Sequence, residues 1–553
     1  MTDVPPIPGE TAHRTYPPRA RRWLPAAAVA VGLLYALAVN GQWAIRADSA
    51  RVMTLGRSLA EGRGLEYNGV PAPGAAPLVP AVIAGCRLLA GPHALWLINA
   101  LVSLCGVGTA LAALGIVNRM VWGRRTKAAR VPLAVGTFLV VGVSARLFGD
   151  ATVASADVPM AFLAALGVYA FVRSREGHWA WCLLGAAAFA AAAGARWDAL
   201  VLYPPVAAAV LLDRGAPGRS KRLLGTLVAS AVVAGVVGLW FYGTGGRWPA
   251  EGVAGPRLVL PWQTADAAEG WARLVADLAR APLAVAEVLT DQELAGANVV
   301  LAGLALVGLA VAVWRRWWLV ALPVVAYAAW LAARGGVLTA RSLLPLLPLV
   351  ACCLLAGTWW TAAATVGWVR SGRVRRAVPR MATLVVIVIC LAISVPKDLR
   401  AVAWARHGDF YRAYAHGKWR GVVEVSQALA RRGRPGTDAV ATPDPAVVHY
   451  LTRLTVVTGP LGTHEGRPFG LWDPEGVPAA EFAEAAAAGR FRFLVIPADE
   501  PAWTPAVLEA LAGTRAFTRP ETFVDVALLE RLPPASAAET RKMIDMPPAP
   551  SGR

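Results

Sequence analysis

The sequence predicts an α-helical polytopic membrane protein of about eleven spans, followed by a small α/β domain outside the membrane. Hydrophobic residues make up 56% of the 553 residues and charged residues only 16%, which is too apolar for a soluble protein of this length. Arg and Lys gather in short loops between the apolar runs, as the charge bias of cytoplasmic loops requires. After Lys397, charge, Pro and Gly increase and alternating apolar runs appear, which predicts strands.

The net charge of +19 does not indicate a nucleic-acid partner, because the sequence has no basic stripe with interleaved aromatic residues. The 6 cysteines fall in apolar segments without a CxxC pair, which favours packing residues over a disulfide framework. The 7 histidines are scattered, and no His and Asp residues have the spacing of metal ligands. The sequence therefore predicts no particular metal site, although it leaves a divalent metal cation open as a cofactor.

Basic residues before the first apolar run predict a cytoplasmic N-terminus in a multi-pass cell-membrane protein. We expect a disordered cytoplasmic tail at 1–20, a membrane domain at 21–396, an extracytoplasmic α/β domain at 397–533 and a disordered tail at 534–553. The predicted spans are 23–43, 94–118, 131–148, 158–173, 180–195, 199–212, 223–242, 297–313, 319–333, 343–363 and 381–396. Strands are expected within 438–459, 491–498 and 523–532, and a surface helix within the outer segment 243–296.

Residues 44–93 form an outer loop that is more than a plain connection. The pattern over 48–61 predicts an amphipathic helix lying in the membrane interface. Residues 75–90 form a second apolar segment that two prolines and an arginine interrupt. We expect a juxtamembrane helix there, because a span would place the cations of 119–130 outside, against the positive-inside rule.

Asp48 begins the amphipathic helix, on the predicted outer surface. It is a favoured helix N-cap residue, and the functional alternative is a general base that faces an acceptor hydroxyl. In the next outer loop, Asp150 and Asp157 precede a span, where Asp is a common helix-start residue.

Arg196 lies at the outer tip of a hairpin of spans, close to Asp198. Arg341 precedes a later span, with Arg334 nearby. Interfacial anchoring explains such arginines, and so does a surface pair of Arg196 with Asp198. The functional alternative is a ligand for a phosphate, which a guanidinium binds through two hydrogen bonds.

The order of these features resembles the first outer loop of the GT-C glycosyltransferases that use polyprenyl-phosphate sugars. The resemblance rests on a span, the outer Asp48, an amphipathic helix ending in Leu59–Gly62–Gly64, and the segment PGAAPLVPAVIAG. In layout it covers residues 20 to about 400, and it is nearest to the group of the protein O-mannosyltransferases and the lipid A aminoarabinose transferase. Ala75–Ala76 replaces an acidic–basic pair of the aminoarabinose branch, which argues against that sugar, with Glu66 as a partial substitute.

The resemblance implies an inverting hexosyl- or pentosyltransferase. It would move a sugar from a polyprenyl-phosphate donor to an extracytoplasmic lipid, glycan or protein. Asp48 would be the catalytic base, and Asp157 would approach it to position the acceptor or help hold a divalent cation. Arg196 and Arg341 would bind the lipid phosphate, although Ser342 stands where the family has an aromatic residue. Asp150, Glu66 and Arg334 are further candidates.

Two other classes stay open. A lipid or polysaccharide transporter or flippase would place ionisable residues deep within the spans and use paired broken helices. A non-catalytic partner in cell-envelope assembly would bind other proteins through its outer domain. The candidate residues lie at the outer ends of the predicted spans, which favours chemistry at the membrane surface.

Overall fold

The computed structural model describes most of the chain between Pro18 and Leu532. The described ranges are 18–44, 46–72, 74–120, 130–176, 178–213, 219–243, 267–290, 295–333, 339–369, 371–407, 418–457, 462–464, 467–469, 477–497, 505–514, 516–518, 520–523 and 526–532. Arg334, the predicted tail at 534–553 and nearly all of the predicted tail at 1–20 lie outside them.

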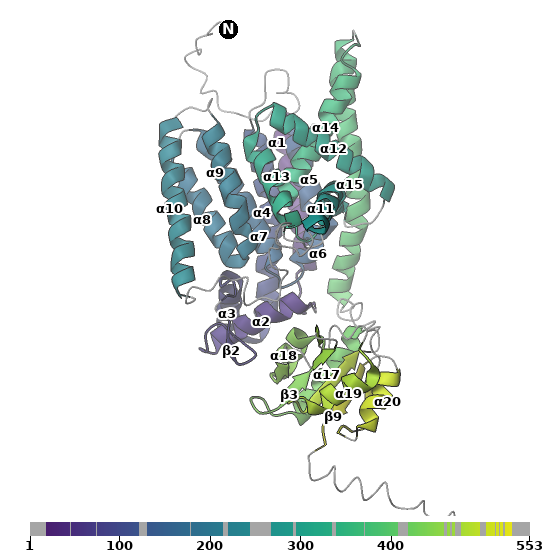
Figure 1. The fold of residues 1–553 in the computed structure, drawn as a ribbon. Coiled ribbons are helices and arrows are strands. Elements are labelled where there is room, and N and C mark those ends of the chain that lie inside the picture. The colour runs from purple at the N-terminus through teal and green to yellow at the C-terminus, as the bar shows by residue number, and fades with distance from the viewer. Residues whose placement is uncertain are drawn as a thin grey trace, which may run out of the picture.

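A bundle of apolar helices forms one part of the molecule, and a smaller domain lies at one end of it (Figure 1). The bundle helices are α1 (Pro18–Ala38), α4 (Ala94–Arg119), α5 (Arg130–Gly142), α6 (Ala145–Ala151), α7 (Asp157–Arg173), α8 (Ala180–Ala195), α9 (Tyr203–Leu212), α10 (Arg219–Gly243), α12 (Ala295–Trp314), α13 (Trp318–Ala333), α14 (Leu347–Thr365) and α15 (Gly372–His407). Four short 3-10 helices adjoin these α-helices. η1 (Gly91–His93) precedes α4, η3 (Ser174–Glu176) follows α7, η4 (Trp197–Leu202) precedes α9 and η7 (Leu344–Leu346) precedes α14.

Within the described ranges, six helices are long and apolar enough to cross a membrane, and seven if the bent pair α5–α6 counts as one span. Shorter apolar helices lie at four further predicted spans: Leu24–Ala38, Ala180–Ala195, Trp197–Leu212 and Trp318–Ala333. The total of about eleven therefore stays a prediction.

The segment predicted as a span over 131–148 is bent in the structure, because α5 and α6 meet at an angle of 48°. Ser144 starts the second helix: its hydroxyl accepts a hydrogen bond from the Leu147 backbone N–H at 3.5 Å. The same hydroxyl donates to the Val288 carbonyl at 3.0 Å, which ties the bend to α11 (Ala267–Thr290). A side chain that replaces lost backbone bonds makes such a break tolerable inside an apolar bundle.

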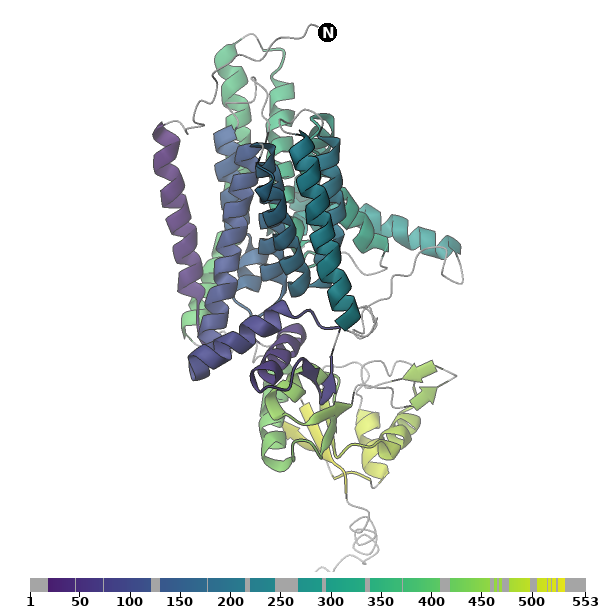
Figure 2. The same ribbon diagram turned by 90° about the vertical axis from the view of Figure 1, so that its left-hand side faces the viewer.

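Helices α2 (Ala47–Ala60) and α3 (Leu78–Ala90) lie across the end of the bundle that faces the smaller domain (Figure 2). The short hairpin of β1 (Glu66–Tyr67) and β2 (Val70–Pro71) joins them. The apolar stretch from Leu78 to Arg119 is continuous in composition, but α3 turns away from α4 in Figure 2. The amphipathic and juxtamembrane helices predicted from the sequence therefore occupy the surface on which the candidate site is built.

Gly56 lets α2 approach α3 closely. A Cβ at this position would lie 2.6 Å from Ile83 Cβ and 3.0 Å from the Pro80 carbonyl oxygen. We expect Gly56→Ala to push the helices apart at a cost of about 1–3 kcal/mol and to lower the melting temperature of the detergent-purified protein. Gly85→Ala is the matched control on α3, where a Cβ meets nothing within 4 Å. Equal melting of the two variants would contradict this packing.

The smaller domain contains a five-stranded sheet in the order β4-β3-β7-β9-β8. Its strands are β3 (Ala439–Ala441), β4 (Thr455–Val457), β7 (Phe493–Pro497), β8 (Glu521–Phe523) and β9 (Val526–Glu530). β3 pairs in parallel with β4 and β7, and β9 pairs antiparallel with β7 and β8. A separate two-stranded sheet consists of β5 (Gly462–His464) and β6 (Arg467–Phe469).

Helices cover both faces of the five-stranded sheet. α17 (Lys418–Arg432) and α18 (Pro445–Thr452) pack on one face, and α19 (Ala479–Ala488) and α20 (Pro505–Gly513) pack on the other. Successive strand residues point to opposite faces, so Val495 joins the first layer and Ile496 the second. The predicted domain start at Lys397 falls inside α15, which continues to His407.

The smaller domain rests on the segment that leads into α2. The Trp43 and Tyr450 rings meet edge to face with their centroids 4.5 Å apart. Asn68 pairs through its side-chain amide with both backbone groups of Val456, donating to the carbonyl and accepting from the N–H, each at 2.7 Å. The segment around α2 and the β1–β2 hairpin therefore packs directly against the smaller domain.

Candidate active site

Asp157 is the centre of a buried ion-pair cluster at the end of the bundle that faces the smaller domain. It is the first residue of α7, and its side chain is only 3% exposed. Arg341 donates to Oδ2 from Nε at 2.7 Å and from Nη2 at 2.6 Å. Arg196 donates to Oδ1 from Nη1. One carboxylate thus fixes two guanidinium groups that belong to different loops.

Asp48 joins this cluster through Arg341. Its Oδ2 lies 2.7 Å from Arg341 Nη1, and its side chain is 63% exposed. The helix-cap interpretation is wrong, because α2 begins at Ala47 and the N-cap residue is Arg46, which makes no side-chain cap bond. Asp48 instead lies in the first turn, where a negative charge is favourable beside the helix N-terminus. An exposed carboxylate next to a buried cluster is accessible to a substrate.

Arg196 and Arg341 are both fixed by carboxylates of the chain. Arg196 also pairs with Asp198 at 2.7 Å, as predicted. Burial alone would lower the pKa of Arg196, but Asp157 and Asp198 raise it above its ordinary value. Burial likewise opposes the charge of Arg341, whose pKa Asp157 and Asp48 raise. Both guanidinium groups therefore stay charged.

Asp150 belongs to a separate ion-pair set in α6. Its Oδ1 lies 2.5 Å from Arg46 Nη1, and its Oδ2 lies 3.0 Å from Arg146 Nε. Since Arg46 is the N-cap residue of α2, this buried carboxylate holds the start of that helix in place. Sequence reasoning missed both arginines, although the spacing of Arg146 and Asp150 on one helix face was readable.

Glu66 lies outside the cluster. It belongs to β1, and its Oε1 lies 3.4 Å from Arg63 Nη1. Among the described residues, no group of three or more His, Cys, Asp or Glu side chains is placed to hold a metal ion. Asp48 and Asp157 share the Arg341 guanidinium, which occupies the position between them.

An apolar groove of about 360 Å³ lies between α3, α4 and α7. Val82, Leu101 and Leu104 line it with side chains that are exposed on the surface of the bundle. Its other lining residues include Ser155, two positions before Asp157 in the chain. The groove therefore lies beside the start of α7, the helix whose first residue is Asp157, and sequence reasoning missed this groove.

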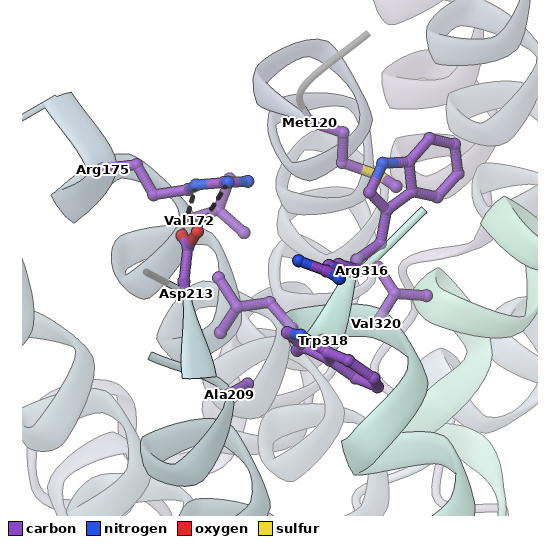
Figure 3. A pocket seen from close by; sticks show the side chains of 10 residues that line it. Met120, Val172, Arg175, Ala209, Asp213, Arg316, Trp318 and Val320 are labelled. Atoms are coloured by element: carbon purple, nitrogen blue, oxygen red, sulfur yellow. Dashed lines mark hydrogen bonds and ion pairs between the residues drawn. The ribbon is translucent and has the colours of Figure 1, made fainter. Parts of the chain in front are cut away.

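A smaller pocket of about 20 Å³ lies at the opposite end of α7, among Arg175, Asp213 and Arg316 (Figure 3). Arg175 Nε lies 2.8 Å from Asp213 Oδ2, and the buried Arg222 approaches the same oxygen at 3.4 Å. This volume is about that of a single water site. The cluster ties the ends of three helices together and is distant from Asp157.

No protein-family model and no curated protein matches the chain. Solved structures match it over most of its length. ArnT from Cupriavidus metallidurans bound to undecaprenyl phosphate is 14% identical, with a TM-score of 0.56 over 93% of this chain and 99% of that one. The oligosaccharyltransferase AglB from Archaeoglobus fulgidus, in complex with an inhibitory peptide and a dolichol-phosphate, is 12% identical, with a TM-score of 0.56 over 90% and 72%.

These likenesses extend across the membrane bundle and most of the smaller domain, since they cover 90% or more of the chain. The resemblance noted in the first outer loop is thus confirmed at the level of the whole fold. The chain has the GT-C fold, which it shares with these solved structures.

Proposed function

We propose that the protein is an integral membrane glycosyltransferase that moves a sugar from a polyprenyl-phosphate donor to an extracytoplasmic acceptor with inversion. The observation that carries this proposal is the meeting of Asp48, Arg341 and Asp157 beside an apolar groove. The site offers an accessible carboxylate, two fixed cations and an apolar surface at one place. These are the parts that a lipid-linked phosphate sugar and an attacking hydroxyl require.

Solved structures with the same fold support a lipid-phosphate donor. The matching ArnT structure holds undecaprenyl phosphate, and the matching AglB structure holds a dolichol-phosphate. In the present chain, the groove that ends near Ser155 would take the first units of such an apolar tail. The phosphate would then lie next to Arg341 and Arg196.

The donor phosphate would replace Asp48 on Arg341. A guanidinium has five N–H donors, of which Arg341 uses two on Asp157 and one on Asp48. The bonds to the buried Asp157 fix the orientation of Arg341, whereas the bond to the exposed Asp48 is solvent-screened and exchangeable. Exchange would free Asp48 Oδ2 at the moment the donor is bound.

The reaction would proceed as a single displacement. The acceptor oxygen attacks the anomeric carbon while the bond from this carbon to the phosphate oxygen breaks, and the electron pair leaves with the polyprenyl phosphate. The acceptor proton passes to Asp48, whose carboxylate acts as general base. Arg341 and Arg196 stabilise the charge that grows on the leaving phosphate.

Release of polyprenyl phosphate tests this function directly. Purified protein would be mixed with a labelled polyprenyl-phosphate sugar and a total lipid and glycan extract as the acceptor source, and the lipid and sugar products would be separated. We expect equal amounts of polyprenyl phosphate and labelled acceptor. Movement of intact donor between the leaflets of a vesicle, without cleavage, would instead identify a flippase.

Filling the groove should weaken donor use. We expect Val82→Trp to raise the KM for the polyprenyl-phosphate sugar about tenfold or more, because the indole occupies the groove beside Phe162. The kcat at saturating donor should change much less. Leu224→Trp is the matched control, since Leu224 is 64% exposed on α10 and lies away from the groove. Equal KM values for the two variants would place the lipid tail elsewhere.

A further inference from the structure

A polar cavity of about 430 Å³ lies between α2 and the smaller domain, apart from the ion-pair cluster. One wall comes from the last turns of α2 and the β1–β2 hairpin, and the other comes from α18 and the adjoining segments. Small-molecule sites have volumes of about 300–1,000 Å³, so this cavity has the size of a ligand site. Ser58 in its wall lies about 15 Å from Asp48 along the axis of α2.

Three arginines and two glutamates line this cavity. Arg63 pairs with Glu61 at 2.5 Å and with Glu66 at 3.4 Å. Arg453, from the other wall, approaches Glu61 at 3.3 Å. Arg57 is the third arginine. Both carboxylates are therefore already engaged, and the wall carries one more positive charge than negative charges.

Arg57 carries this excess charge. Its Nη2 donates to the Tyr450 carbonyl at 2.9 Å, and its guanidinium lies 4.9 Å from the centroid of the Tyr450 ring. Within the described ranges it has no carboxylate partner at ion-pair distance. Burial lowers the pKa of Arg57, and the positive charge of Arg453 lowers it further, which outweighs the opposite effects of Tyr450 and Glu61. A half-buried guanidinium that has no carboxylate at ion-pair distance favours an anion that provides one.

The remaining lining suits a ligand rich in hydroxyl groups. The Ser58 hydroxyl is buried and has no hydrogen-bond partner within the described part of the chain. His449 is held at Nδ1 by the Leu454 carbonyl at 2.7 Å, and burial lowers its pKa, so the ring is neutral near pH 7. Hydroxyl, imidazole and carboxylate groups together offer hydrogen-bond donors and acceptors, and each hydroxyl group of a sugar can both donate and accept.

We infer that this cavity binds an acidic saccharide unit, a uronate or a sugar phosphate, of an oligomeric acceptor. The inference rests on the proposed function, because it places the reacting hydroxyl of the same acceptor at Asp48. The acidic unit lies against Arg57, and its hydroxyls contact Ser58 and His449. The cavity thereby selects acceptors by charge at a distance from the reaction.

Isothermal titration of the full-length protein in detergent tests the inference with glucose, glucuronate, glucose 6-phosphate and inorganic phosphate as probes. We expect glucuronate or glucose 6-phosphate to bind about tenfold or more tightly than glucose, because a charge-assisted hydrogen bond contributes about 1.5–3 kcal/mol. Whichever of the two binds more tightly identifies the acidic group. Three results would overturn the inference. Glucose could bind as tightly as the acidic sugars, inorganic phosphate could bind as tightly as glucose 6-phosphate, or none of the probes could bind.

Variants of the lining arginines test whether the acidic sugar binds in this cavity. Arg57→Gln should weaken the acidic sugar about tenfold or more. Arg57 also contacts Tyr450, so Arg453→Gln provides a second variant at a more exposed side chain in the opposite wall. Arg420→Gln on α17 is the control, because Arg420 pairs with Glu424 and does not line the cavity. Unchanged affinity in both cavity variants would overturn the assignment.

The titration contains no donor, so its result is independent of sugar transfer. Loss of acidic-sugar binding in a protein that still releases polyprenyl phosphate counts against the cavity alone. Acidic-sugar binding by a protein that never cleaves the donor counts against the proposed transferase.

Discussion

Replacing Asp48 by Asn abolishes sugar transfer, with a fall in kcat of about 10²–10⁴-fold, the range that a general base contributes. The amide keeps the shape of the side chain but does not accept the acceptor proton. The melting temperature should stay near that of the parent, because an exposed ion pair such as Asp48–Arg341 contributes only about 0–1 kcal/mol. The measurement is release of polyprenyl phosphate under saturating donor, together with a melting curve.

Donor affinity distinguishes a base from a structural residue at this position. Since the phosphate is proposed to displace Asp48 from Arg341, the Asn variant should bind the donor as tightly as the parent or more tightly. Glu424→Gln, an exposed carboxylate-to-amide change on α17, is the control and should leave both transfer and binding unchanged. A variant at Asp48 that transfers sugar within a few-fold of the parent rate would remove the base assignment.

Replacing Asp157 by Asn has the largest expected effect on stability, about 3–5 kcal/mol. Its carboxylate is the shared partner of Arg196 and Arg341, and it is almost fully buried. Removing the negative charge of Asp157 leaves the guanidinium groups of Arg196 and Arg341 incompletely compensated. We expect a markedly lower melting temperature and a loss of donor binding, because Arg341 is no longer held in one orientation.

Two further variants separate this effect from a general sensitivity of the cluster. Asp198→Asn removes a carboxylate that contacts Arg196 alone and should lower the melting temperature less. Asp157→Asn combined with Arg341→Gln should melt above the single Asp157 variant, since it removes one of the uncompensated charges. If the Asp198 and Asp157 variants melt alike, the shared-partner interpretation of Asp157 does not hold.

The sequence was informative wherever a single local pattern decided the structure. Apolar runs predict the positions of the bundle helices, and the amphipathic pattern after Asp48 predicts α2. The bend at Ser144 was not predictable in this way, because the run stays apolar through it and the break depends on a contact with Val288. Hydropathy reports the environment of a segment, and it does not report which backbone groups a distant residue satisfies.

The candidate site shows the same limit. Asp198 lies two residues from Arg196, and this pair was predictable from proximity. Arg341 meets Asp157 across 184 residues, and only the packing of α7 against the turn before η7 brings them together. Sequence reasoning assigned both arginines to a lipid phosphate, whereas the structure gives each of them an internal carboxylate first. The role in phosphate binding therefore stays a prediction.

The pairing of Asn68 with Val456 has a consequence for the biogenesis of the protein. Val456 is the middle residue of β4, which forms one edge of the five-stranded sheet, and unpaired edge strands recruit other extended chains. The Asn68 amide occupies the backbone groups of Val456 as a neighbouring strand would. During synthesis Asn68 is made long before the strand that it protects. When the sheet forms, its edge cover is therefore already present, which shortens the time in which two nascent copies can aggregate through their edges.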